Sequence, residues 1–248
     1  MRRRMMTSIV GGAKKPTARD YVQDGLVAMW DGIENVGWGE HSDNKIITDL
    51  ISGVVYDLPN DATVHNDHIK FEKQSPLRIN TAVAIDSAHT MESCGCITSR
   101  PTSTSNTAGS CLYDARSLFM WRNTPSGASG IIGCSSIMDD GKLHYFGFPS
   151  SNQTAMNEAN AEIYGVFRSR SCDISQNTAD IRGFVNGVEK IGTNTMTYID
   201  TPVRGTVVIG NSSTTEVLIG CFRVYNRVLT VAERAKNYAI DKARFRLD

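Results

Sequence analysis

The sequence has no long apolar run. Its apolar stretches all fall well short of the eighteen or so residues that a membrane-spanning helix needs. The opening MRRR and the MMTSIVGG that follows resemble the start of a signal peptide, but the apolar part is short, and Lys14, Lys15 and Pro16 come soon after it. We therefore expect a soluble protein with no membrane segment and no cleaved leader.

Motifs of the common enzyme classes are also missing. There is no Gly-x-Ser-x-Gly nucleophile elbow, and Gly127–Gly130 approaches it in composition but has the wrong spacing. A P-loop, a dinucleotide fingerprint and a His-Glu-x-x-His zinc motif are absent as well. The nine glutamates are scattered, and the nearest pair, Glu158 and Glu162, stands in a segment typical of a loop or of the start of a strand. The sequence therefore predicts a protein that is not an enzyme.

The cysteines lack the spacing of a disulfide-stapled secreted domain or of a zinc site. They are Cys94, Cys96, Cys111, Cys134, Cys172 and Cys221. Cys94 and Cys96 are two apart in an extended segment, so their side chains share one face of a strand. His65 and His68 have no matching pair that would complete a metal site. We expect reduced thiols buried in strands, as suits assembly in a cytoplasm, with a disulfide as the alternative and no bound metal.

The net charge is zero, with 26 basic and 26 acidic side chains, but the charges are unevenly placed. Residues 1–20 hold six basic side chains and one acid, Asp20, which leaves 20 basic and 25 acidic groups in the rest of the chain. The six are Arg2, Arg3, Arg4, Lys14, Lys15 and Arg19. Basic arms of this kind bind nucleic acid, anionic membranes or acidic proteins, although a solvated tail is the alternative.

No aromatic side chain lies among the arginines at positions 2–4, and no known nucleic-acid-binding motif is present. A polar arm has no reason to be ordered by itself. We therefore predict no specific nucleic acid and no membrane as a partner. The arm is expected to be held by an acidic protein surface or by another copy of the chain.

The pattern of apolar residues favours β-structure. The 248-residue chain is 40% hydrophobic and rich in Gly, Ser, Thr and Asn, which favours strands joined by turns over a helical bundle. Apolar runs recur about every ten residues, as in a β-sandwich or barrel. The predicted strands are 26–30, 46–50, 54–58, 63–71, 77–85, 94–97, 111–121, 130–138, 143–148, 163–167, 181–185, 188–191, 206–209 and 217–225. Asn186 and Gly187 between two of them predict a two-residue hairpin turn.

The chain is expected to end in one helix. Thr230 is a good N-cap, and Glu233 three residues later completes a capping box. Apolar and long side chains then recur at intervals of three and four and are expected to form the inward face. They are Val231, Ala235, Tyr238, Lys242 and Phe245. We expect this helix to follow an edge strand and to lie as a lid on one edge or end of the sandwich.

Five segments together carry a family pattern. They are DGLVAMWDGIEN (24–35), ITDLISG (47–53), GFVNGVEK (183–190), VVIGN (207–211) and IGCFRVYNRVLTVAERAKNYAIDKARF (219–245). The first has an apolar strand ending in Trp before Asp-Gly, and the last has Arg-x-Tyr-Asn-Arg-x-Leu-Thr before a helix with an early Glu and a later Asn-Tyr. Together they resemble the laminin-G-like, concanavalin A-like jelly-roll family. The resemblance covers about residues 21–245 and is specific for fold only, because this fold hosts lectins, hydrolases and structural modules.

The resemblance implies an all-β jelly-roll sandwich of two antiparallel sheets over residues 21–248, with a C-terminal helix, preceded by the basic arm of residues 1–20. A start of Met-Arg-Arg-Arg-Met-Met before such a domain is also similar to proteins of gut Bacteroidetes and their tailed, crAss-like phages. The β-glucanases of this fold need acids at Glu-x-Asp-x-x-Glu or a form one residue shorter, and this chain has neither.

Sugar sites on jelly rolls use exposed aromatic rings with polar neighbours. Two groups of residues fit that description. They are Trp38, His41 and Asp43 in the predicted loop 37–44, and Trp121, Arg122 and Asn123 at a strand end. The alternative for each Trp is a ring that plugs the rim of the core. Some relatives use calcium, for which Asp31, Asn35 and Asp43 offer oxygen atoms without a spaced ligand motif.

Three functions follow from these expectations. The first is a non-enzymatic phage virion protein, such as a head-decoration, head-fibre or tail-associated subunit, made in the host cytoplasm and anchored by its arm to other virion proteins or to copies of itself. The second is a carbohydrate-binding or adhesion module of a bacterial cell surface. The third is a glycoside hydrolase with an atypical pair of acids.

Overall fold

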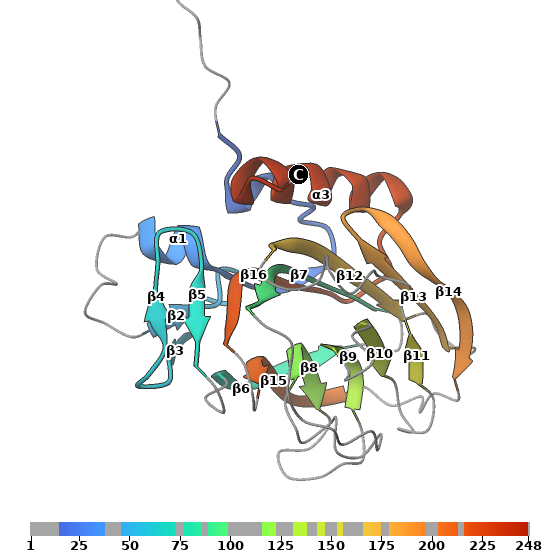
Figure 1. Ribbon diagram of the computed structural model, residues 1–248, viewed down its shortest axis with the longest axis horizontal. Coiled ribbons are helices and arrows are strands. Elements are labelled where there is room, and N and C mark those ends of the chain that lie inside the picture. The colour runs from blue at the N-terminus through green and yellow to red at the C-terminus, as the bar shows by residue number, and fades with distance from the viewer. Residues whose placement is uncertain are drawn as a thin grey trace, which may run out of the picture.

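The computed structural model describes residues 15–37, 46–72, 77–85, 89–98, 116–122, 131–137, 143–146, 153–155, 166–174, 179–196, 203–212 and 216–247. These residues form two large antiparallel sheets in layers, and a C-terminal helix lies over the outer face of the larger sheet (Figure 1). The prediction of a mainly β chain with a C-terminal helix is confirmed at this level.

The larger sheet has eight strands, with β16 (Val217–Tyr225) at its centre. The order is β14 (Val188–Met196), β13 (Ala179–Val185), β12 (Arg168–Ile174), β7 (His89–Ile97), β16, β5 (Ile69–Phe71) and β4 (Thr63–Val64), and β1 (Leu26–Asp31) also pairs with β16. β5 pairs with the first residues of β16 and β1 with the last ones, while β7 lines its other side. The prediction that the strand before the final helix lies at the edge of a sheet is therefore wrong. β16 is buried along most of its length, as a central strand between a helix and a second sheet should be.

The second sheet has six strands in the order β11 (Gln153–Ala155), β10 (Leu143–Phe146), β9 (Ile131–Ile137), β8 (Arg116–Arg122), β15 (Val203–Ser212) and β6 (Leu77–Ile85). β15 approaches β16 and β8 approaches β7, so the two sheets face each other through their central strands. A small separate sheet pairs β2 (Ile46–Thr48) with β3 (Val55–Asp57).

Several strands differ from their predicted bounds. The predicted strand 63–71 is a hairpin of β4 and β5, because residues 65–68 form a turn in which His65 N donates to the His68 carbonyl at 2.8 Å. Of the predicted strand 163–167, Val166 and Phe167 precede β12 without belonging to a strand. β12 itself reads RSRSCDI, and its many polar residues conceal the strand. Two short helical segments were also not predicted: a 3₁₀ turn at Ala18–Asp20 and α1 (Gly32–Gly37).

The Asn-Gly hairpin is confirmed. Asn186 and Gly187 have φ of 48° and 76°, and they join β13 to β14 as the two central residues of the turn. Both angles lie in the left-handed region, which Asn and Gly adopt more readily than other residues. The local sequence was enough to predict this turn, which two hydrogen bonds between Asn186 and Ser169 also hold.

The C-terminal helix, α3 (Val231–Phe245), begins as predicted. Thr230 is extended, its hydroxyl accepts from the Glu233 backbone N–H at 3.3 Å, and its own N–H donates to the Glu233 carboxylate at 2.8 Å. Arg227 adds two contacts to the same carboxylate at 2.9 and 2.6 Å. Hydrogen bonds from Arg227 and then from the Thr230 backbone lower the pKa of Glu233 to about 2.

The position of α3 and its inward face both differ from expectation. The helix crosses the face of the eight-stranded sheet and is not placed at an edge or an end (Figure 1). Of the five predicted inward residues only Phe245 is buried, and Val231 is 73% exposed. The buried residues of α3 are Arg234, Asn237, Ile240, Asp241, Arg244 and Phe245. The spacing of apolar residues predicted the wrong inward face, because the sheet beneath the helix presents charged residues to it.

Within the part of the chain that the structure describes, no helix is long and apolar enough to cross a membrane. Apolar packing inside this part includes Trp30 of β1 and Phe222 of β16, which are paired in register and stack with ring centroids 5.6 Å apart. In a second cluster, Tyr21 and Val22 of the N-terminal segment, residues 15–25, pack with Tyr225 of β16 and Ile240 of α3.

Candidate functional site

A layer of buried charges lies between α3 and the eight-stranded sheet. At its centre, the Arg223 guanidinium of β16 donates to both carboxylate oxygens of Asp241 at 2.8 and 2.9 Å. Its Nε donates to Glu92 of β7 at 3.0 Å. All three side chains are almost fully buried. Such an arrangement holds only when every member is paired, because each isolated charge would be costly to bury.

The environment of Asp241 keeps its carboxylate ionised. Burial by itself would raise the pKa of Asp241, but the charge of Arg223 and hydrogen bonds from Arg223, Ser169 and Tyr21 lower the pKa below its ordinary value. The Tyr21 hydroxyl and the Ser169 hydroxyl each donate to it at 2.6 Å. Glu92 differs, because burial outweighs the attraction of Arg223 and raises its pKa.

Two further buried pairs flank this centre. Arg244, near the C-terminal end of α3, donates to both oxygens of Asp31 at the end of β1, at 2.6 and 2.8 Å. Arg234, in the first turns of α3, pairs with Asp173 of β12 and lies over the Phe184 ring with its central carbon 3.8 Å from the centroid. Burial is the main cause of two pKa shifts here. It raises the pKa of Asp31, and it raises the pKa of Asp173 to about 6.

The N-terminal segment, residues 15–25, is fixed by the same layer. The Tyr21 ring lies beneath Arg223, whose guanidinium carbon is 3.9 Å from the ring centroid. The Val22 N–H donates to the Asn237 side chain at 2.9 Å, and the Tyr225 hydroxyl donates to the Val22 carbonyl at 3.2 Å. Helix, N-terminal segment and sheet are therefore joined by the charged layer, which we interpret as a structural clasp.

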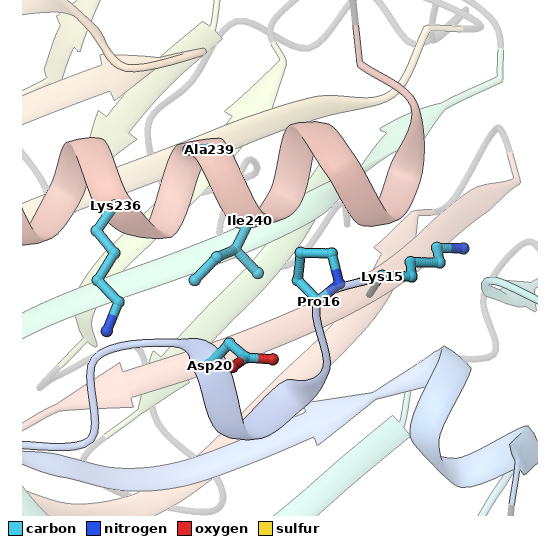
Figure 2. Close-up of a pocket in the computed structure, with 6 residues that line it drawn as sticks. All are labelled: Lys15, Pro16, Asp20, Lys236, Ala239 and Ile240. Carbon is cyan, nitrogen blue, oxygen red and sulfur yellow. The ribbon is translucent and has the colours of Figure 1, made fainter. Parts of the chain in front are cut away.

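A shallow groove separates the N-terminal segment from α3. Its volume is about 390 Å³, and it is lined by Lys15, Pro16, Asp20, Lys236, Ala239 and Ile240. Figure 2 shows Lys236 and Ile240 extending from α3 toward the segment, with Pro16 beside Ile240. The groove is more apolar than the second pocket of this region.

The second pocket, called here the basic pocket, has a volume of about 430 Å³ and lies at the C-terminal end of α3. Its lining comes from three separate segments: Lys15, the turn of residues 65–68, and Arg244 with Arg246. The His65 and His68 rings stack with centroids 4.5 Å apart, and His68 Nδ1 lies 2.7 Å from Asp67. Burial, followed by the charges of His68 and Lys70, lowers the pKa of His65.

Arg246 has an unusual backbone conformation. It is the C-cap of α3, with φ of 56° and ψ of 44°, and its N–H donates to the Lys242 carbonyl. Gly or Asn normally occupies a left-handed position of this kind, because other L-residues adopt it at a cost of about 1–2 kcal/mol. A positive charge here interacts favourably with the helix dipole. It also places an exposed cation at the basic pocket.

The predicted sugar-binding residues fall mostly outside the described part. Trp38, His41, Asp43 and Asn123 lie outside it, and only the backbone of Trp121 and Arg122 is described, at the end of β8. The two groups are therefore neither brought together nor separated by the structure. They remain predictions.

The other predicted residues lie partly inside and partly outside the described part of the chain. Arg2, Arg3, Arg4 and Lys14 of the arm lie outside the described residues, whereas Lys15 and Arg19 are exposed within the segment that packs near α3. The oxygen atoms of Asp31, one of the three that were considered for calcium, are bound by Arg244. Asp43 and the side chain of Asn35 are not described. The residues that are described contain no cluster of three His, Cys, Asp or Glu side chains suited to a metal.

Comparison with solved structures shows the fold. The sialidase of Trypanosoma rangeli matches with a TM-score of 0.63 at 14% identity, over 92% of this chain and 33% of that one. The receptor-binding domain of botulinum neurotoxin type G gives a TM-score of 0.60 at 11% identity, over 88% of this chain and 51% of that domain. The binding domain of paraclostridial mosquitocidal protein 1 gives 0.60 at 11%, over 86% and 52%.

The chain thus spans about a third of the sialidase and half of each binding domain. At these identities the likeness concerns the β-rich fold alone. No protein-family model matches the sequence, and no curated protein is significantly similar to it. None of these three structures is a laminin-G-like or phage protein by name, so both resemblances stay predictions.

Sequence reasoning missed the clasp and the basic pocket. Arg234, Asn237, Asp241 and Arg244 recur at intervals of three and four along α3, which is the spacing of one helix face. That signal was present in the sequence. It does not by itself indicate burial, because charged residues at such spacing usually mark a solvated face.

Proposed function

We propose that this protein is a non-enzymatic binding module: a concanavalin A-like jelly-roll sandwich that recognises surface glycans. The observation that carries the proposal is the shared fold. Two of the solved structures that this chain resembles over most of its length are named as binding domains of toxins. In this class of fold, function resides in sites added to the scaffold, so the glycan assignment is a separate claim.

The use of the buried carboxylates supports a binding role over a catalytic one. Asp31, Asp173 and Asp241 are each paired with an arginine of the clasp, and Glu92 shares Arg223. Asp49 accepts hydrogen bonds from the Met29 and Ile51 backbone at 2.9 and 3.0 Å. Glycosidases need a pair of carboxyl groups that faces the substrate, and these acids are instead engaged inside the fold.

A glycan array tests the proposal directly. The wild type is expected to retain a defined set of glycans, and Trp38→Ala or Trp121→Ala is expected to lose them if the corresponding loop forms the site. Tyr56→Ala provides a control, because Tyr56 is a half-buried ring in β3 that no prediction places in a sugar site. If no glycan is retained by the wild type, the proposed function is wrong.

Attachment to a phage particle is the second part of the proposal. It is favoured by the N-terminal segment, which Val22 and Ala18 tie to Asn237 and Glu34, so that the basic arm leaves from a fixed point. Purified particles should contain this chain in stoichiometric amounts by mass spectrometry. Deleting residues 1–14 should prevent incorporation while leaving glycan binding intact, because that deletion spares Ala18 and Tyr21, which are buried.

A further inference from the structure

We infer that the basic pocket binds one anionic group, a carboxylate or a sulfate, carried by an acidic sugar. The anion-binding part stands on the geometry of the pocket. The identification of the carrier as a sugar rests on the proposed glycan-binding function.

The charges around the pocket favour an anion. Two exposed cations, Lys15 and Arg246, line it against one carboxylate, that of Asp67, and the third cation of the lining, Arg244, is already paired with Asp31. Asp67 is engaged by His68 at 2.7 Å, which reduces its repulsion of a bound anion. Positive charges that two separate segments bring to one pocket attract an anion more strongly than a single exposed cation does.

Arg244 places a fixed guanidinium group in the lining of the pocket. Its terminal nitrogens are held by Asp31 at 2.6 and 2.8 Å, and the Tyr21 hydroxyl lies 3.2 Å from Nη1, so the guanidinium has one orientation. The side chain is 1% exposed. Its Nε is buried and has no hydrogen-bond partner among the described residues. The Nε atoms of Arg227 and Arg234 are buried without a partner as well, so the contribution of Arg244 to the pocket is a fixed guanidinium in its lining.

Arg246 provides a second, adjustable contact. It is exposed, and it occupies a left-handed backbone position where Gly would be less strained. Positions where the chain departs from local preference often serve a binding site. An arginine at this point can form a paired contact with a carboxylate or a sulfate.

The size and the remaining lining suit a sugar bearing the anion. A volume of about 430 Å³ lies in the range of small-molecule sites, roughly 300–1,000 Å³, and exceeds what one bare ion would fill. Asn66 and the stacked rings of His65 and His68 add polar contacts and a flat surface. A hydroxylated ring around a charged group matches this combination.

The test is an NMR titration of the full chain with three kinds of probe at constant ionic strength. The acidic probes are glucuronic acid and galactose 6-sulfate, the neutral ones are glucose and galactose, and sodium sulfate reports on the anion alone. We expect the acidic probes and sulfate to shift the imidazole signals of His65 and His68, and neutral sugars to have no effect on them. Arg246→Gln and Lys15→Gln should each weaken binding by about tenfold, as loss of one charged contact does.

Lys236→Gln is the matched control. It removes the same charge from α3 but stands ten residues before Arg246, about 15 Å along the helix, and it lines the shallow groove and not the basic pocket. Its affinity for the acidic probes should equal that of the wild type, and all variants should keep the wild-type melting temperature within about 2 °C. Raising the salt to 0.5 M should weaken binding of the acidic probes, because exposed charges are screened.

The outcomes separate the two claims. The claim that the basic pocket binds the anion is wrong if Arg246→Gln and Lys15→Gln keep the wild-type affinity for the acidic probes. It is also wrong if the NMR shifts are confined to histidines other than His65 and His68. Equal binding of neutral and acidic sugars at these signals overturns the anionic ligand but leaves the proposed glycan function standing. If sulfate binds with the expected variant pattern while every sugar fails, the anion site stands and the sugar as its carrier is wrong.

Discussion

Arg223 of β16 and Asp241 of α3 meet in a two-point ion pair that is completely buried, with N–O distances of 2.8 and 2.9 Å. The two residues are eighteen positions apart, and they join the central strand of the larger sheet to the helix above it. Around them, Glu92, Tyr21 and Ser169 complete the hydrogen bonding. The clasp therefore depends on this pair more than on any other.

Breaking this pair should be strongly destabilising. Asp241→Asn leaves Arg223 buried without a full counter-charge, and we expect the free energy of unfolding to fall by about 3–5 kcal/mol. Urea denaturation followed by circular dichroism measures it. Arg182→Gln is the control, because its pair with Glu189 is exposed and should be worth less than about 1 kcal/mol. Equal effects of the two substitutions would contradict the clasp.

Replacing both partners should recover much of that loss. In Arg223→Met with Asp241→Leu, neither partner of this pair is left as an unpaired charge, while Glu92 loses its guanidinium and keeps its hydrogen bond from Asn237. We expect the double variant to be more stable than Asp241→Asn, since buried ion pairs exchanged for apolar side chains are often neutral in stability. A double variant that is less stable would show that the network acts as an indivisible unit.

Asp173 should make stability fall as the pH rises. Burial raises its pKa from 3.8 to about 6, so between these values the folded chain keeps a proton that the unfolded chain has lost. The contribution of this group is therefore present below about pH 4 and is lost as the pH rises through 6, by up to about 3 kcal/mol. Denaturation midpoints from pH 4 to 7 measure it.

Asp173→Asn is the variant that isolates this effect. It should be less dependent on pH than the wild type across the same interval, because an amide has no proton to lose. Glu92 and Asp31 also have raised pKa values and should leave a residual slope of the same sign. The prediction is wrong if the variant and the wild type show identical slopes.

Gly220 should tolerate no side chain while Phe245 is present. A Cβ at Gly220 would lie 2.5 Å from the Phe245 ring, so Gly220→Ala must displace the end of α3 from β16. Overpacking of this kind costs about 1–3 kcal/mol. In a Phe245→Leu background the same change should cost clearly less, which thermal unfolding of the four combinations can measure. Additive effects would show that the ring and the glycine are not coupled.

The three described buried thiols should resist modification. Cys94, Cys96 and Cys221 are buried, and burial raises the pKa of Cys221 well above its ordinary value. Since the thiolate is the reactive form, iodoacetamide should label these three slowly in the folded protein and quickly in 6 M urea. Peptide mass spectrometry resolves each site. Rapid labelling of Cys221 under native conditions would contradict its placement.

Some elements could be read from the sequence because their signals are short-range. The capping box needs only Thr230 and Glu233, three residues apart, and the hairpin needs only Asn186 and Gly187. β12 was missed for the opposite reason. It is polar along much of its length, because one face lies against the charged side of α3, and alternation of apolar residues is then a poor guide.

The candidate site could not be predicted as a site. The basic pocket combines Lys15, the turn at 65–68 and Arg244 with Arg246, which are separated by about 50 and 180 positions in the sequence. In the sequence, His65 and His68 indicate only an incomplete metal motif. Nothing local indicates that a turn between two short strands meets the end of the last helix.

The sequence by itself determined the β-rich architecture, the start of the final helix and the tight turn between β13 and β14, since hydrophobic period, caps and turn residues act over a few positions. Only the tertiary structure decided that β16 is a central strand and that α3 buries its charges. The physical reason is that a charge can be buried only opposite its partner. The partners of Asp241, Arg244 and Arg234 come from β16, β1 and β12, which folding alone brings together.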